Sequence, residues 1–143
     1  MTVYYVRKGG NDSATGTSIA NSWASIDRVN SHTFSPGDKI LFEGGSVFTG
    51  NIYIPVSGII IRSYGRGRAL IQAGDSYGIL VYNVGNWIVS NIEFVGNENN
   101  ADAGIQVYND TGEEIVGITI EREGRIGNYN PKKDSDNNKP WNT

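Results

Sequence analysis

Residues 78–96 read GILVYNVGNWIVSNIEFVG, and this stretch decides the fold because the chain repeats it. Residues 104–124 read GIQVYNDTGEEIVGITIEREG and align with it without a gap, at an offset of 26 positions (from 78 to 104). A repeat of this length, built from short apolar runs separated by Gly and Asn, is typical of a chain wound in stacked coils. The alignment predicts these vertical pairs: Gly78/Gly104, Tyr82/Tyr108, Asn83/Asn109, Val89/Ile115, Ile92/Ile118 and Phe94/Ile120.

Alternation within the two copies predicts which side chains face the interior. Successive side chains of a strand point to opposite sides of the sheet. Leu80 in the first copy corresponds to Gln106 in the second, so this side should face water, and Tyr82 and Tyr108 share it. The predicted interior set is apolar in both copies: Ile79, Val81, Ile92, Phe94, Ile105, Val107, Ile118 and Ile120.

Equivalent residues of consecutive coils would lie about 4.8 Å apart if the coils pair as parallel strands. Tyr82 would then stack on Tyr108, and Asn83 would lie over Asn109. Asparagine tolerates the left-handed backbone of a tight bend, and an asparagine pair could satisfy backbone groups that the bend removes from the sheet. The tyrosine pair leaves two interpretations open, a structural stack and a platform for a sugar ring.

The first 35 residues are predicted to cap the first coil. Residues 3–6 read as a strand, and residues 22–30 (SWASIDRVN) predict the one helix, with Ser22 as N-cap and Trp23 and Ile26 on its apolar face. Such a helix would cover the open edge and apolar end of the first coil, which would otherwise recruit other strands.

The chain reads as one β-helix domain followed by a polar end. The predicted coils occupy residues 36–124 and, with the cap at 1–35, make a domain of residues 1–124. Residues 125–143 are rich in Asn and contain two prolines, so we expect a polar loop or tail, or the start of a coil that the sequence does not include. An exposed edge on the last coil would favour self-association.

Three stretches resemble a known family: PGDKILFEGG at 36–45, IIIRSYGRGRALI at 59–71 and the repeat that begins at Gly78. Together with the opening YYVRKGGNDSATGTS and SWASIDRVN, they are similar to the N-terminal portion of secreted proteins of the pectate lyase-like superfamily. The resemblance covers roughly residues 3–123. It implies an all-β, right-handed parallel β-helix (a solenoid) with one short N-terminal capping helix.

The resemblance also implies an extracellular or cell-surface protein that binds or cleaves polysaccharide, from which we expect a signal peptide to have been removed. Lyase members use a Lys or Arg base with calcium, and hydrolase members use two or three carboxylates. No subfamily motif is matched residue by residue, so the catalytic residues are unknown. Two functional classes stay open, a carbohydrate-active protein without a complete active site and a non-catalytic structural or adhesive scaffold.

The outward positions supply the candidate substrate-binding residues. Glu93 lies between two predicted interior residues and should therefore point out of the sheet. The other outward candidates are Arg62, Tyr82 and Tyr108. Residues 121–123 (ERE) read as a solvent-facing charged run.

Three carboxylates within five positions form a candidate metal site: Asp110, Glu113 and Glu114. Oxygen ligands of this kind suit calcium. The alternative is a solvated acidic loop that keeps the sheet edges unpaired.

Composition and charge exclude several classes of function. A net charge of −3 provides no basic footprint, which argues against a nucleic-acid partner. No run reaches the roughly 18 apolar residues that a membrane-spanning helix needs, so we expect no membrane insertion. The absence of cysteine excludes a disulfide framework and cysteine-ligated zinc.

Overall fold

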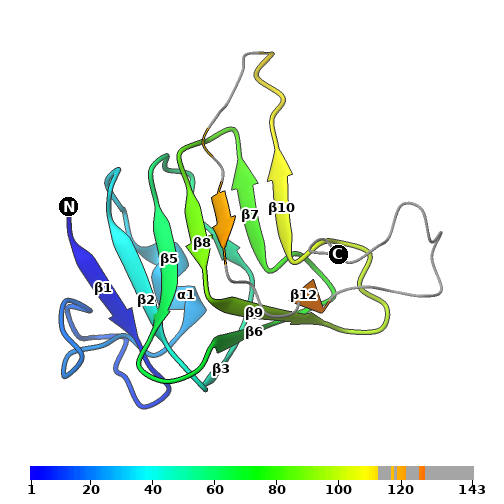
Figure 1. Ribbon diagram of the computed structural model, residues 1–143. Helices are drawn as coiled ribbons and strands as arrows, with labels where there is room; N and C mark the ends of the chain where they lie inside the picture. Colours follow the sequence, from blue (N-terminus) through cyan, green and yellow to red (C-terminus); the bar gives the residue numbers. More distant parts are fainter. Residues whose placement is uncertain (113–116, 118, 122–125, 128–143) are drawn as a thin grey trace.

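The computed structural model describes residues 1–112, 117, 119–121 and 126–127. Within this part of the chain, almost all regular structure is β-strand, arranged in parallel sheets (Figure 1). The five-stranded sheet has the order β1 (Val3–Val6), β2 (Lys39–Glu43), β5 (Ile60–Tyr64), β8 (Ile88–Ser90) and β11 (Thr119–Glu121). The four-stranded sheet contains β3 (Val47–Thr49), β6 (Ala69–Gly74), β9 (Ile92–Gly96) and β12 (Ile126–Gly127). The three-stranded sheet contains β4 (Ile52–Tyr53), β7 (Ile79–Tyr82) and β10 (Ile105–Tyr108).

The chain visits the three sheets in a fixed cyclic order. It runs from β2 to β3 to β4 and then returns to the five-stranded sheet at β5, and the same cycle repeats through β6, β7 and β8. Every strand pairing is parallel, so each turn of the chain lies on the turn before it. The arrangement is β-helix-like, and it confirms the predicted stacking of consecutive coils.

Apolar side chains fill the space between the three sheets in vertical rows. Each row consists of residues that face one another in the strand register and are buried: Ile40–Ile61–Val89, Phe48–Ile71–Phe94 and Ile52–Ile79–Ile105. Burying one such side chain stabilises the fold by about 1.5–3 kcal/mol relative to leaving it exposed. The rows therefore hold the turns on one another.

The gap-free repeat is confirmed in its first half and wrong in its second. Tyr82 pairs with Tyr108 in register, as predicted. Val89 however pairs with Ile120 and Phe94 with Ile126, whereas the alignment predicts Ile115 and Ile120. The connection from β10 to β11 is longer than the one from β7 to β8. Hydrogen bonding between strands sets the register whatever the length of the loop, so the gap-free alignment fails after this connection. Ile115 and Ile118 lie outside the described residues.

Val107 belongs to the predicted interior set but is exposed in the structure. Its register partner Val81 is fully buried, yet Val107 is 47 % exposed. β10 is the outermost strand of the three-stranded sheet in the described part of the chain. Val107 points to the interior side but no described strand covers it.

The helix begins later than predicted. α1 spans Ile26–Ser31, and its N-cap is Ser25, whose Oγ accepts a hydrogen bond from Arg28 N at 3.1 Å. Ser22 is buried and donates its hydroxyl to the Ile19 carbonyl at 2.6 Å. Trp23 is extended, not helical, because it pairs with the outer edge of β1. Its N–H donates to Tyr5 O, and its carbonyl accepts from Arg7 N, both at 2.9 Å.

α1 packs against the edge of β4 and closes it with one side chain. Asn30 Nδ2 donates to the Asn51 carbonyl at 2.7 Å, and Asn30 Oδ1 accepts from Tyr53 N at 3.0 Å. The amide therefore takes the place of a neighbouring strand, while Ile26 and Val29 are buried beneath it. No helix in the described residues is long and apolar enough to cross a membrane.

Candidate functional site

The four candidate substrate-binding residues lie on three different sheets. Arg62 is on β5 of the five-stranded sheet, and Glu93 is on β9 of the four-stranded sheet. Tyr82 and Tyr108 are on β7 and β10 of the three-stranded sheet. Only the two tyrosines are brought together, so the candidates do not form one site.

Glu93 occupies the outer side of its sheet. Its chain neighbours Ile92 and Phe94 are buried, and Glu93 is half-buried beside its register partner Leu70 on β6. The predicted outward orientation is correct. The register partner is apolar, so it offers Glu93 neither a proton donor nor a second carboxylate.

The outer side of the three-stranded sheet is largely aromatic. Tyr53 pairs in register with Leu80, Leu80 with Gln106, and Tyr82 with Tyr108. Four of the strand residues that alternate with these are buried, namely Ile52, Ile79, Val81 and Ile105, which places the five side chains on the outer side. We call this surface the tyrosine face; its residues are Tyr53, Leu80, Tyr82, Gln106 and Tyr108.

Tyr82 and Tyr108 of this face stack on each other, and Asp110 holds Tyr82 by a hydrogen bond. Their ring centroids are 5.5 Å apart, with 25° between the ring planes. The Tyr82 hydroxyl donates to Asp110 Oδ2 at 2.6 Å. This hydrogen bond is the main reason why the pKa of Tyr82 is raised and the pKa of Asp110 is lowered. Both observations describe a phenol that stays protonated beside an ionised carboxylate.

Asn83 marks the bend after β7, as predicted for the first member of the asparagine pair. Its φ of 59° is left-handed, as expected for asparagine at a tight bend. Its side chain exchanges hydrogen bonds with Asp110: Nδ2 donates to Oδ1 at 2.8 Å, and Oδ1 accepts from Asp110 N at 2.9 Å. Asn109 Oδ1 accepts from Thr111 N at 3.0 Å, so both asparagines satisfy backbone N–H groups at the bend, as predicted.

Of the three residues of the predicted metal site, only Asp110 is among the described residues. Asp110 uses one carboxylate oxygen for Tyr82 and the other for Asn83. Glu113 and Glu114 lie outside the described residues. In the part of the chain that the structure covers, no group of three or more His, Asp or Glu residues could hold a metal ion. Calcium binding stays a prediction.

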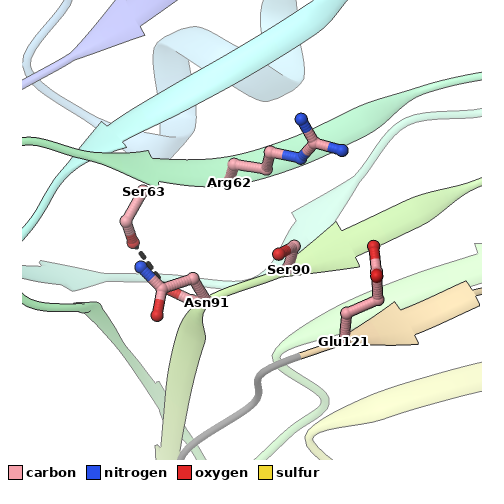
Figure 2. A pocket seen from close by; sticks show the side chains of 5 residues that line it. All are labelled: Arg62, Ser63, Ser90, Asn91 and Glu121. Atoms are coloured by element: carbon pink, nitrogen blue, oxygen red, sulfur yellow. Dashed lines mark hydrogen bonds between the residues drawn. The ribbon is translucent and has the colours of Figure 1, made fainter.

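A polar groove lies on the outer side of the five-stranded sheet. Its cavity of about 360 Å³ is lined by Arg62, Ser63, Ser90, Asn91 and Glu121 (Figure 2). Arg62 on β5 faces Ser90 on β8, and Ser90 faces Glu121 on β11. Neighbouring strands lie about 4.8 Å apart. A cation, a hydroxyl and an anion therefore follow one another across three adjacent strands.

The floor of the groove is fixed by hydrogen bonds around Asn91. This residue has a left-handed φ of 60°, and its N–H donates to the Glu121 carbonyl at 3.0 Å. Its carbonyl accepts from Ser63 Oγ at 2.7 Å, and its Oδ1 accepts from Arg68 Nε at 3.1 Å. By contrast, the Arg62 guanidinium and the Glu121 carboxylate form no hydrogen bond or ion pair with the residues described in the structure.

Sequence reasoning selected Arg62 but missed its neighbours in the groove. The offset of 26 positions places Glu121 opposite Val95, on another sheet, whereas the structure places it beside Ser90. Glu121 is exposed, as predicted for the run at 121–123, but the alignment does not predict its place beside Ser90. A search that allowed a gap after Tyr108 would have aligned Val89 with Ile120 and found the row.

No protein-family model matches the chain, and no curated protein matches it. Two crystal structures of GH136 lacto-N-biosidase from Eubacterium ramulus, a selenomethionine derivative and the native protein, do match it. The TM-scores are 0.68 and 0.67, with 21 % and 22 % sequence identity. Each match covers 94 % of this chain and 29 % of the other. The similarity shows a shared fold, and the chain spans less than a third of those proteins.

Proposed function

We propose that this chain is the N-terminal part of a secreted or cell-surface, right-handed parallel β-helix protein of the pectate lyase-like superfamily, and that it binds polysaccharide. Crossovers between parallel strands are right-handed in nearly all known cases, which supports the handedness. The family assignment is supported by the stretches at 36–45 and 59–71. The similarity to a glycoside hydrolase fold supports the choice of ligand class.

The tyrosine face is the observation that carries this proposal. Tyr108 is 52 % exposed and Tyr53 is 36 % exposed, although both lie on regular strands. A sugar ring has an apolar C–H face and a hydroxyl rim, which match the ring and the hydroxyl of an amphipathic tyrosine. The stack on Tyr82 and the hydrogen bond from Tyr82 to Asp110 restrain this tyrosine pair, so binding on Tyr108 loses less side-chain entropy.

The described residues support recognition rather than cleavage. Glycosidases generally use two carboxylates on either side of the scissile bond. The five residues of the tyrosine face include no carboxylate, and both oxygens of Asp110 accept hydrogen bonds. A catalytic pair would have to come from residues outside the tyrosine face.

Titration with a panel of neutral and acidic oligosaccharides tests the proposal by calorimetry. Replacing Tyr108 by Ala should weaken binding about fivefold, since an aromatic contact contributes about 1 kcal/mol beyond buried area. Tyr108→Phe keeps the ring and should retain most of the affinity. Failure of the wild-type chain to bind any glycan would refute the proposal and favour the structural or adhesive scaffold.

A further inference from the structure

We propose that the polar groove on the five-stranded sheet is a second binding site, which takes two neighbouring hydroxyl groups of a neutral sugar ring. The ligand class rests on the proposed function, because a carbohydrate partner makes a hydroxyl pair the relevant ligand. The site itself is independent of the tyrosine face: it lies on a different sheet and shares no residue with it.

The order of charges in the groove selects the ligand. Figure 2 shows the Ser90 hydroxyl on the strand between Arg62 and Glu121. An anion attracted by the guanidinium would be repelled by the carboxylate, and a cation would meet the opposite conflict. A neutral ligand avoids both. The groove should therefore discriminate against acidic and amino sugars.

Hydrogen-bonding capacity points to hydroxyl groups in particular. A guanidinium only donates, an ionised carboxylate only accepts, and a hydroxyl does both. Of two adjacent hydroxyls on one ring, the first can accept from Arg62 while the second donates to Glu121. Ser90 can serve either one. Both charged groups lack a hydrogen-bond or ion-pair partner among the described residues, so no bond within this part of the chain competes with the ligand.

The size of the groove and its fixed floor also suit the binding of a small ligand. Its cavity of about 360 Å³ lies in the range of small-molecule sites. The bonds that Asn91 makes with Ser63, Arg68 and the Glu121 backbone fix the floor before any ligand arrives. Preorganisation of this kind reduces the entropy lost on binding. On binding, only the charged ends of the Arg62 and Glu121 side chains would have to become ordered.

The test uses methyl glycosides of neutral hexoses together with deoxy counterparts that lack one ring hydroxyl. Arg62→Gln and Glu121→Gln should each weaken binding of the intact glycoside about tenfold, as expected for a hydrogen bond to a charged group. Glu98→Gln, in an exposed loop, is the matched control and should leave affinity unchanged. The deoxy sugar that lacks the bonded hydroxyl should bind weakly to the wild type and lose nothing further in the variant.

Two readouts separate this site from the tyrosine face. Ligand-induced shifts of the Ser90 and Asn91 amide resonances should appear with the wild type and persist in Tyr108→Ala. Binding that Tyr108→Ala removes and the groove variants leave intact would overturn the groove and leave the proposed function standing. Tighter binding of an acidic sugar by Glu121→Gln, without loss of neutral sugar binding, would also overturn it. Sensitivity to the groove variants alone would support the groove and refute the tyrosine face.

Discussion

The two ends of the described coil stack differ in how their strand edges are covered. At the N-terminal end, Trp23 pairs with the outer edge of β1 and Asn30 closes the edge of β4. At the other end, β10 carries Val107 with 47 % of its surface exposed, whereas Val81 directly beneath it is fully buried. The burial of a residue in such a fold therefore depends on whether another turn lies over it. Its own place in the alternating pattern is not sufficient.

The largest effect should come from placing one charge at equivalent positions of two neighbouring turns. Val81→Asp buries an unpaired carboxylate and should lower the free energy of unfolding by about 4 kcal/mol or more. Val107→Asp should cost less than about 1 kcal/mol, because water reaches the new carboxylate. Urea unfolding measured by circular dichroism checks both. Equal destabilisation by the two substitutions would show that Val107 is covered in solution.

Removing the Asn30 side chain should destabilise the N-terminal end of the coil stack by less than Val81→Asp destabilises the fold. Asn30→Ala leaves the Tyr53 N–H and the Asn51 carbonyl without their partner, so stability should fall by about 1–2 kcal/mol. The freed edge of β4 should also promote self-association, detected by analytical ultracentrifugation. Asn99→Ala, at an exposed loop position, is the control and should change neither quantity.

The smallest effect should be a pH dependence of stability that arises from His32 at the N-terminal end of the coil stack. Burial, followed by repulsion from Arg28, lowers the pKa of His32, while Asp38 acts in the opposite direction. The ring packs among Tyr4, Trp23 and Phe34, and its Nε2 lies 3.0 Å from the Tyr4 hydroxyl. The unfolded chain therefore binds a proton more readily than the native one.

The stabilising contribution of neutral His32 should be complete above the ordinary histidine pKa of about 6.5 and decline as pH falls below it. Urea unfolding at a series of pH values between about 8 and 5 measures the slope. His32→Gln should flatten the slope in this window, because the chain has no other histidine. A slope that survives the substitution would assign the titration to another group.

The alternating sequence pattern predicted burial and strand register correctly where short connections join consecutive strands. Ile79, Val81 and Ile105 are buried as predicted, and Tyr82 stacks on Tyr108. Capping rules predicted Ser22 as the N-cap of the helix, which is wrong. Ser22 and Ser25 are equally suitable N-caps, and the backbone pairing of Trp23 with β1 leaves only Ser25 for the helix.

Asparagine side chains satisfy turn backbone groups at more positions than the repeat predicted. Asn51 Nδ2 donates to the Ala73 and Tyr77 carbonyls at 2.9 and 2.6 Å. Asn100 Nδ2 donates to the carbonyls of Gly74 and Ser76, both at 2.7 Å. Two asparagines from neighbouring turns thus hold one bend. Asn83 and Asn109, for which the alignment predicted such a role, accept from the backbone N–H groups of Asp110 and Thr111.

The amino-acid sequence by itself determined that this chain forms short, parallel, stacked strands, because alternation and the spacing of Gly and Asn are local properties. Tertiary structure alone decided which turn lies over which residue. It brought Arg62, Ser90 and Glu121 into one row across connections of unequal length, and it left Val107 exposed where Val81 is buried. The physical reason is that hydrogen bonding between strands sets the register, and this register does not depend on the number of residues in the loops.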